Sequence, residues 1–283
     1  MTAYLRPMKL PALALLCVSG LAHAGGASFV DGLSSEDTAR WMRTDNVYPG
    51  EPANSAWRAD HIAFAAGQME LRLNTQPCLT APEQCASRPS ASGQLRSQET
   101  YGFGRYTAVL RAAAGDGVVT DFMKYTGGVV GNPTDLIGMH IQGQDPTRMQ
   151  VSYFLDGVGA RYHTVSLGFD ASLSMHTYAF DWSAGALRWY VDGSEVFNAT
   201  GVGLPAAEGH IVSDVWAASP VTAALFGTYT NAPTRAVFDS ISFAAAVSPV
   251  PEPGQAALLS MGAGLLAWRR RRVTVRHVVT SHC

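Results

Sequence analysis

The segment DLIGMHIQG, from Asp135 to Gly143, raises the first chemical question in this chain of 283 residues. Alternate side chains of an extended segment lie on one face, so Leu136, Gly138 and His140 would share a face. Only His140 among these three can transfer protons near neutral pH, because a free imidazole titrates at about 6.5. Leucine has no lone pair and glycine has no side chain, so neither can act as an acid, a base or a nucleophile.

Two aspartates hold comparable positions in other alternating segments. Asp121 in TDFMKYT would share a face with Tyr125, and Asp214 in SDVWAAS would share a face with Trp216. Carboxylates beside an imidazole can serve as general acid and base, so Asp121, His140 and Asp214 are candidates for proton transfer. The simpler interpretation is that both aspartates are polar groove residues that hold water or ligand hydroxyls.

The segments around these residues are predicted to be short β-strands. Stretches such as GRYTAVLRAA, MQVSYFLDG and HTYAFDW alternate apolar and polar residues and are rich in β-branched and aromatic side chains. Gly, Pro, Asn and Asp interrupt them at short intervals, and VDGSEVF has the Asp192–Gly193 pair typical of a hairpin turn. No long helical pattern precedes the C-terminal tail. These features predict an all-β fold, a sandwich of two sheets such as the jelly roll.

The composition supports one globular domain and argues against one class of partner. The chain is 47% hydrophobic and 15% charged, with 28 Gly and 15 Pro. Its net charge is −2, but much of the basic charge lies at the two ends, so the body of the chain is more acidic. Nucleic-acid phosphates are bound mainly by Lys and Arg, so we expect no nucleic-acid partner.

Both ends of the chain are predicted to be processing signals. Residues 1–24 have a basic start, an apolar run too short to span a membrane and an Ala-His-Ala cleavage pattern, as in a signal peptide cut by signal peptidase. Residues 247–283 contain a Pro-Glu-Pro, a short apolar run at 255–268 and the four arginines Arg269–Arg272. The predicted globular body is therefore residues 25–246.

The C-terminal segment resembles the PEP-CTERM sorting tail of Gram-negative bacteria that make exopolysaccharide. The resemblance implies recognition by an exosortase, transient membrane association through the tail, and removal of the tail. It also implies delivery to the cell surface or the extracellular matrix. The extension VTVRHVVTSHC beyond the arginines is longer than such tails usually run.

Export also bears on Cys78 and Cys85 in PCLTAPEQC. An exported protein meets an oxidising compartment, so a local disulfide between these two residues is expected. Metal binding is the weaker alternative, because no His and no second Cys pair accompanies them.

The strand segments, taken in order, resemble glycoside hydrolase family 16, in its bacterial lichenase or β-1,3-1,4-glucanase branch. The matching stretches are YGFGRYTAVLRAA, KYTGG, LGFDAS, HTYAFDWSAGALRWYVDG and AVFDSISF. The resemblance extends from about Phe29 to Phe243. It implies a concanavalin-like jelly roll of two antiparallel sheets, with a concave cleft for an extended β-glucan. Each motif alone also suits other β-sandwiches, so the resemblance depends on their order and spacing.

The same resemblance indicates that the catalytic positions have changed. The family's cleft strand carries Glu, Asp and Glu at alternate residues, and these positions correspond here to Leu136, Gly138 and His140. A retaining glycosidase needs one carboxylate as nucleophile and a second as acid and base. Hydrolysis by the family's mechanism is therefore not expected.

Other positions correspond to sugar-binding residues of the family. They are Trp216 and Tyr125, which would stack on sugar rings, together with Arg96, Gln94, Asp214 and Ser152. The two aromatics could instead be plain core residues, and Arg96 a solvated strand residue. Asp239 corresponds to an aspartate that binds a structural calcium, although a lone Asp in a strand is more often only solvated. No cofactor is otherwise required.

These observations leave three hypotheses about function. We favour an exported protein that binds β-glucan or its host's exopolysaccharide without cutting it, because no Glu lies between Glu99 and Glu195. The second is a glucanase or transglycosylase with relocated catalytic groups, such as His140 and the two aspartates considered with it. The third is a purely structural surface protein, which predicts that the cleft aromatics are buried.

Overall fold

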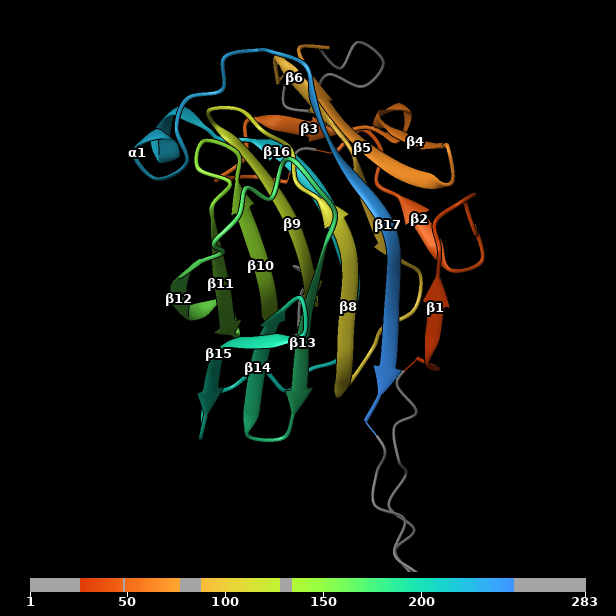
Figure 1. Ribbon diagram of the computed structural model, residues 1–283, viewed down its shortest axis with the longest axis vertical. Helices are drawn as coiled ribbons and strands as arrows, with labels where there is room; N and C mark the ends of the chain where they lie inside the picture. The colour runs from red at the N-terminus through yellow and green to blue at the C-terminus, as the bar shows by residue number, and fades with distance from the viewer. Residues whose placement is uncertain (1–25, 48, 77–87, 128–133, 247–283) are drawn as a thin grey trace, which may run out of the picture. The chain divides into compact units, whose positions relative to one another are not determined.

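The computed structural model describes residues 26–47, 49–76, 88–127 and 134–246, which form two packed β-sheets (Figure 1). The ten-stranded sheet has the order β15 (Ser194–Thr200), β14 (Ala186–Val191), β13 (His176–Ser183), β8 (Gly104–Arg111), β17 (Thr234–Ala245), β5 (Gln68–Asn74), β6 (Ser90–Ser92) and β3 (Ser55–Trp57), with β1 (Phe29–Asp31) on β17 and β4 (Ile62–Ala65) on β5. The seven-stranded sheet has the order β12 (Val158–Ser166), β11 (Arg148–Leu155), β10 (Leu136–Gln142), β9 (Val118–Tyr125), β16 (His210–Ala217), β7 (Gln94–Ser97) and β2 (Trp41–Arg43).

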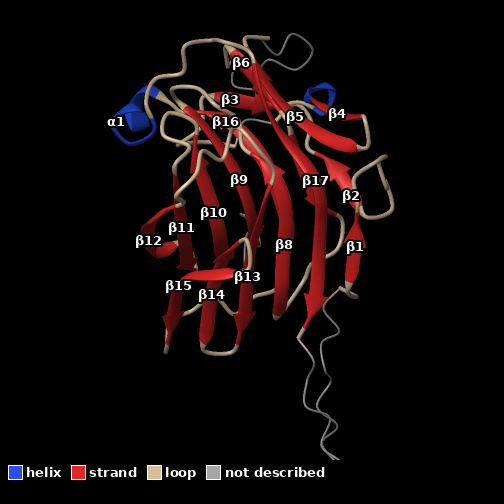
Figure 2. Cartoon of the chain, in the orientation of Figure 1, coloured by secondary structure: helices blue, strands red, loops and turns tan. Residues whose placement is uncertain are grey.

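The predicted all-β sandwich is confirmed. Figure 2 shows strands as the main secondary structure of the described chain, joined by loops, and helix there is limited to η1 (Ala59–His61), η2 (Pro220–Thr222) and α1 (Ala223–Phe226). The named strands pair in antiparallel fashion, except that β3 and β6 run parallel. The predicted hairpin joins β14 to β15, and Asp192 and Gly193 at its turn have positive φ angles of 47° and 81°. These strands belong to one compact unit, Met1–Ala245.

Alternation along the strands decides which side chains of the seven-stranded sheet enter the core. Ile137, Met139 and Ile141 of β10 lie in the buried cluster between the sheets, together with aromatic residues of the ten-stranded sheet such as Phe180. Phe122 of β9 lies in the same cluster. The intervening residues of β9, β10 and β16 therefore point away from the ten-stranded sheet, as the alternation predicted.

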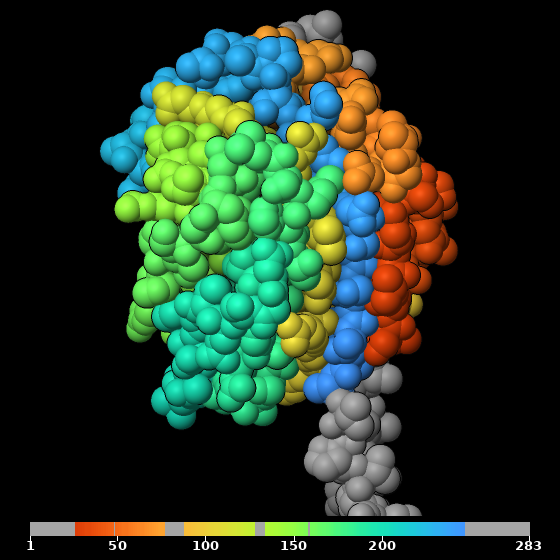
Figure 3. Space-filling view, viewed as in Figure 1, coloured from red at the N-terminus to blue at the C-terminus, as the bar shows by residue number. Residues whose placement is uncertain are grey.

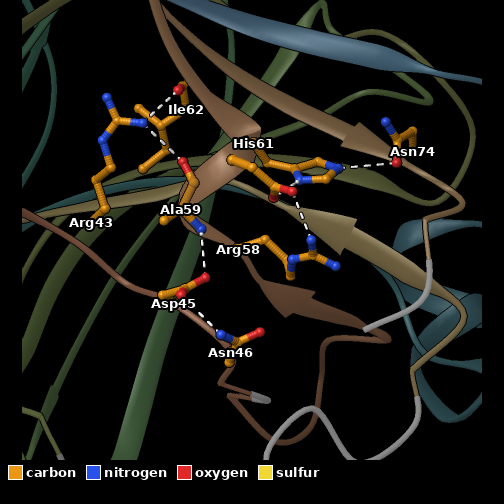
Figure 4. A network of polar contacts seen from close by, with 9 residues as sticks. Arg43, Asp45, Asn46, Arg58, Ala59, His61, Ile62 and Asn74 are labelled. Atoms are coloured by element: carbon orange, nitrogen blue, oxygen red, sulfur yellow. Dashed lines mark hydrogen bonds and ion pairs between the residues drawn. The ribbon is translucent and has the colours of Figure 1, made fainter. Parts of the chain in front are cut away.

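The N-terminal segment packs beside β17 on the surface (Figure 3) and ties the two sheets together. Figure 4 shows Arg43 of β2, whose guanidinium donates to the backbone carbonyls of Ala59 at 2.9 Å and Ile62 at 2.8 Å. The ring of His61 contacts Asn74 of β5 at 3.0 Å. These contacts join β2 of one sheet to η1 and β5 of the other, so they brace residues 44–58 at both ends.

Asp135 fixes the point at which β10 begins. Its buried carboxylate accepts backbone N–H bonds from Asp156 at 2.9 Å, Ala206 at 2.9 Å and Ala207 at 3.0 Å. Hydrogen bonds to an ionised acceptor are stronger than neutral ones. Asp135 therefore holds the two loops that contain residues 156 and 206–207 against the end of the strand that begins at Leu136.

Lys124 of β9 is a charged residue inside the core. It is 0% exposed, and its Nζ makes no hydrogen bond to a described residue, although it lies 4.7 Å from the centre of the Trp182 ring. Burial lowers the pKa of Lys124 from 10.5 to about 8, and the charges of Asp135 and Glu208 oppose that shift. The residue thus costs stability, since a buried cation without a hydrogen-bonded partner is poorly solvated.

Replacement of this lysine should stabilise the fold. We expect Lys124→Met to raise the free energy of unfolding at pH 7 by about 1–3 kcal/mol, because methionine fills similar space without charge. Between about pH 8 and 10.5 the unfolded chain holds the lysine proton that the native state has lost, so wild-type stability rises with pH in that window. The difference between variant and wild type should therefore shrink at pH 10. Urea unfolding at pH 7 and 10 measures it, with exposed Arg148→Met as control; a difference independent of pH would contradict the assignment.

Candidate functional site

A hollow that contains most of the predicted site residues lies on the outer face of the seven-stranded sheet. It has a volume of about 360 Å³. Its lining comes from β3, β7, β9, β10, β11, β12 and β16, from residues 49–53 and from α1: Pro49, Gly50, Glu51, Pro52, Ala53, Trp57, Gln94, Asp121, Met123, Tyr125, Leu136, His140, Gln150, Ser152, Phe154, Tyr162, Asp214, Trp216 and Phe226. We refer to this hollow as the cleft.

The sheet register arranges the polar residues of the cleft in one row. Asp214 of β16 is the Cα partner of Asp121 on β9, and Asp121 is the partner of His140 on β10. Gln94 on β7 and Gln150 on β11 extend the row at its two ends. The structure therefore brings together the three residues that the sequence marked as candidates for proton transfer.

Apolar clusters flank this polar row on both sides. One consists of Met123, Leu136 and Val212, with Tyr125 and Phe154 packed against them. The other consists of Ala53, Trp57, Val119, Trp216 and Ala218, with Phe226 packed against them. The cleft thus presents a narrow polar strip between two apolar surfaces, an arrangement typical of sites that bind amphipathic ligands.

Asp121 is the centre of the hydrogen bonds in the row. Its Oδ1 lies 2.8 Å from Nδ1 of His140, and its Oδ2 accepts the indole N–H of Trp216 at 2.9 Å. The second ring nitrogen of His140, Nε2, lies 2.6 Å from Oγ of Ser152 on β11. Both ring nitrogens of His140 are therefore engaged, and four side chains from four strands form one connected chain.

Gly138 gives the imidazole room to reach Ser152. Gly138 is the Cα partner of Ser152, whereas His140 is the partner of Gln150, so the His140 ring must lean diagonally along the sheet. A Cβ atom on residue 138 would lie 3.0 Å from Nε2 and 3.1 Å from Cε1 of His140. A Cβ at this position would therefore require the His140 ring to shift by a few tenths of an ångström.

Asp214 has a different environment from Asp121. It is 1% exposed, and its Oδ2 accepts a hydrogen bond from the Gln94 amide at 2.9 Å. Gln94 is held in turn by Thr44, whose hydroxyl donates to its carbonyl oxygen at 2.6 Å. Burial, and next the charge of Asp121, raise the pKa of Asp214 well above its usual value. Asp214 therefore holds its proton more tightly than an ordinary aspartate.

The predicted binding residues divide into two groups. Tyr125, Gln94, Asp214, Ser152 and Trp216 all line the cleft, whereas Arg96 does not. Trp216 is only 6% exposed, because the Trp57 and Phe226 side chains pack around it, with the Phe226 ring edge-on at 5.2 Å. Trp216 is placed to donate to Asp121 and offers little ring surface for stacking, whereas Tyr125 is only partly buried.

Several cleft residues were not singled out from the sequence. Tyr162 of β12 is 61% exposed and Gln150 of β11 is partly buried, and both follow from the same alternation as Ser152 and Phe154. Glu51 was also missed; it supplies a carboxylate at the rim, where it accepts a hydrogen bond from the Ser219 hydroxyl. It comes from a loop, and no periodic signal in the sequence pointed to it.

Comparison with protein families identifies the fold that carries this cleft. The family model described as "Glycosyl hydrolases family 16" matches residues 50–232, which is more than half of the chain. The chain belongs to glycosyl hydrolases family 16.

Relatives within family 16 confirm the predicted resemblance to its bacterial lichenase branch. The chain is 35% identical over 220 residues to a beta-glucanase of Paenibacillus polymyxa, covering 77% of this chain and 88% of that protein. The solved structure of the Bacillus licheniformis beta-glucanase superposes with a TM-score of 0.71 at 33% identity, covering 78% and 99% of the two chains. A lichenase from a mouse hindgut metagenome gives a TM-score of 0.72 at 29% identity, covering 77% and 99%.

Further predictions concern the two ends of this family 16 chain and the cysteine pair Cys78 and Cys85. The PEP-CTERM protein-sorting motif matches residues 249–272 and indicates an exported protein. That segment, residues 1–24, Cys78 and Cys85 lie outside the described residues, so the signal peptide and the disulfide stay predictions. Within the described ranges, no helix has the length and apolarity needed to cross a membrane.

The calcium predicted at Asp239 also stays a prediction. Asp239 is exposed on β17, and its Oδ1 accepts a hydrogen bond from Gln68 at 3.1 Å. Among the residues that the structure describes, no three His, Cys, Asp or Glu side chains cluster closely enough to hold a metal ion. A calcium site here would need backbone carbonyls as its other ligands.

The protonation of Asp214 gives a testable effect on stability. Its native pKa is raised, so the native state keeps a proton that the unfolded chain releases above about pH 4, and wild-type stability falls as pH rises from there. Each pH unit in that window costs about 1.4 kcal/mol. Asp214→Asn keeps an acceptor for Gln94 without titrating, so its stability should match wild type near pH 4 and exceed it at pH 8.

Thermal unfolding from pH 4 to 8 measures this difference. Asp239→Asn is the matched control, because the same change on an exposed aspartate should leave the profile unaltered. Parallel profiles for Asp214→Asn and wild type would contradict the raised pKa.

Proposed function

We propose that this chain is an exported carbohydrate-binding protein that holds β-glucan or exopolysaccharide in its cleft and does not cut it by the mechanism of its family. The observation that supports this most directly is the floor of the cleft. The positions that correspond to the family's Glu, Asp and Glu are Leu136, Gly138 and His140 on β10. Two of these three residues have no ionisable group.

Asp121 and Asp214 are poorly suited to replace the missing pair, and the third carboxylate of the cleft, Glu51 at the rim, accepts a hydrogen bond from the Ser219 hydroxyl. A retaining glycosidase needs two carboxyl groups about 5–5.5 Å apart on either side of the glycosidic bond, and an inverting one needs about 6.5–9.5 Å. Asp121 already accepts hydrogen bonds at both oxygens, from His140 and Trp216. Asp214 is its immediate neighbour in the row, and its Oδ2 already accepts a hydrogen bond from the Gln94 amide.

The alternative is a glucanase or transglycosylase that uses Asp121, His140 and Asp214. Their position in one row of the cleft favours it, as does the raised pKa of Asp214, which suits a general acid. Against it, Asp214 Oδ2 already accepts the Gln94 amide, and both oxygens of Asp121 are engaged by His140 and Trp216. We therefore rank this function second.

The walls of the cleft suit a neutral polysaccharide. The C–H faces of a sugar ring are apolar and stack on aromatic rings, while its hydroxyls bond to amides and hydroxyls. Tyr125, Phe154 and Tyr162 supply partly or largely exposed rings, and Gln94 and Gln150 supply amides. The PEP-CTERM motif adds an export route that ends, in our proposal, at the Gram-negative cell surface or its matrix, where such a polymer is available.

Glycan retention tests the binding function. We expect the purified protein to sediment with insoluble β-glucan or with the host's exopolysaccharide, and Tyr162→Ala to weaken retention about tenfold through the loss of one stacking ring. Leu173→Ala is the matched control, because Leu173 is 76% exposed but lies outside the cleft lining. Equal retention of wild type and Tyr162→Ala, or none by wild type, would count against the proposal.

An assay for reducing ends tests the absence of glycosidase activity. Incubation with lichenan, laminarin or native exopolysaccharide should release no new reducing ends and leave chain length unchanged, since the cleft lacks a placed nucleophile for the anomeric carbon. The result that favours the alternative is cleavage that disappears in both Asp121→Asn and Asp214→Asn. A beta-glucanase assayed in parallel confirms that each polymer is susceptible.

A further inference from the structure

The side chains of the hydrogen-bonded chain in the cleft follow the order Asp, His, Ser. Glycan binding, the proposed function, does not require this order. Asp121 Oδ1 lies 2.8 Å from His140 Nδ1, and His140 Nε2 lies 2.6 Å from Ser152 Oγ. A carboxylate only accepts hydrogen bonds, so Nδ1 carries the proton that it receives. In the neutral imidazole Nε2 then has a free lone pair, and the Ser152 hydroxyl donates to it.

This order is that of a nucleophile, a base and a group that orients the base. Three adjacent strands supply it, β11 for Ser152, β10 for His140 and β9 for Asp121. The second oxygen of Asp121 accepts the Trp216 indole N–H at 2.9 Å, in a buried contact that prevents the carboxylate from turning. The imidazole is thus fixed in one tautomer and one orientation.

Gly138 leaves space for this geometry. A Cβ there would lie 3.0 Å from His140 Nε2, the atom that contacts Ser152. Gly138, which has no side chain of its own, is therefore the residue that leaves space for His140 to contact Ser152. A merely degenerate floor has no need for a glycine at this point.

A second Ser–His–Asp chain in the protein has similar hydrogen bonds but lies outside the cleft. Ser174 Oγ lies 2.9 Å from His176 Nε2, and His176 Nδ1 lies 2.7 Å from Asp192 Oδ2. This chain sits on the exposed end of β13, and none of its residues lines the cleft. All three residues of the first chain do line the cleft, so a ligand held there can meet them.

The cleft also offers donors for a negatively charged oxygen beside Ser152. Tyr162 on β12 is the Cα partner of Ser152, and Gln150 precedes it by two residues on the same face of β11. Both line the cleft and carry N–H or O–H groups. Such donors stabilise the oxyanion that forms when a hydroxyl attacks a carbonyl carbon. Ser152 is 1% exposed, so only a group that enters the cleft reaches it.

We propose that Ser152, His140 and Asp121 form a catalytic triad that hydrolyses ester groups, with O-acyl esters on polysaccharide hydroxyls as the substrate class. Ester hydrolysis itself rests on the triad, whereas the polysaccharide substrate rests on the proposed binding function. Ser152 is the nucleophile and His140 the base. Asp121 and Gly138 are positioning residues that act through His140.

The reaction balances with water as the only other reactant. Ser152 Oγ bonds to the acyl carbon as its proton passes to His140 Nε2. The bond between the acyl carbon and the sugar oxygen then breaks, and Nε2 returns the proton to that oxygen. Water, deprotonated by His140, attacks the acyl-serine, and the Ser152 hydroxyl and a free carboxylic acid are released.

The triad is tested first without any glycan. The wild-type protein should hydrolyse 4-nitrophenyl acetate and react with a fluorophosphonate at one residue, which peptide mass spectrometry should identify as Ser152. Ser152→Ala should lower the rate about 10³-fold or more, and Ser174→Ala should leave rate and labelling unchanged. Absence of turnover, labelling at Ser174, or full activity in Ser152→Ala would overturn the triad. The labelling needs no variant, so it decides even if Ser152→Ala does not fold.

The positioning residues are tested by comparing the effects of their substitution on kcat and on KM. Asp121→Asn and Gly138→Ala leave the nucleophile and the cleft walls in place, so they should lower kcat at least tenfold with KM little changed. A change in KM alone would mean that they only shape the cleft. Rates unchanged in both variants would overturn the orienting role assigned to them.

The substrate class is tested with O-acetylated and unacetylated samples of one β-glucan. Wild type should release acetate from the acetylated polymer and sediment with both samples, and Ser152→Ala should release no acetate. If the wild-type protein sediments with the polymer but shows neither acetate release nor serine labelling, the proposed triad is overturned and the proposed binding function stands. If the protein is labelled and hydrolyses the small ester but does not sediment with the polymer, the proposed polysaccharide substrate is overturned and the triad stands.

Discussion

The Asp121 carboxylate is the contact on which the floor of the cleft depends. One oxygen is hydrogen-bonded to the imidazole of His140, and the other accepts a hydrogen bond from the indole N–H of Trp216. The strands β9, β10 and β16 are therefore joined by side chains as well as by backbone. A buried carboxylate is tolerated only when its lone pairs are satisfied. Because Asp121 has both partners, the imidazole is free to present its second nitrogen to Ser152.

The same region carries groups that weaken the fold. Asp214, next to Asp121, is buried with a raised pKa, and Lys124 lies on the opposite face of β9 without a hydrogen bond to any described residue. Both oppose the stability that the aromatic core and the Asp135 contacts provide. Costly polar groups concentrated beside a cleft are typical of functional sites, where stability is traded for chemistry.

Period-two alternation was sufficient to predict most of the fold and one face of the cleft. It correctly placed Asp121, Tyr125, His140 and Asp214 together, because side-chain direction in a strand is a local property. It could not predict the contact between His140 and Ser152, since that contact is diagonal and depends on the space above Gly138. Nor could it predict that Trp216 is covered, because Phe226 and Trp57 reach it from outside the seven-stranded sheet. Loops and rotamers hold no periodic signal.

The proposed loss of the family's acids and the proposed triad are linked by geometry. Cleavage of a glycosidic bond needs two carboxyl groups kept several ångströms apart around the sugar, whereas attack on an ester needs a nucleophile and a base in direct contact. A strand with Glu at position 140 and a side chain at position 138 favours the first arrangement. Glycine at 138 and histidine at 140 close the distance to Ser152 and favour the second. Glycine at 138 and histidine at 140 therefore both contribute to the contact with Ser152.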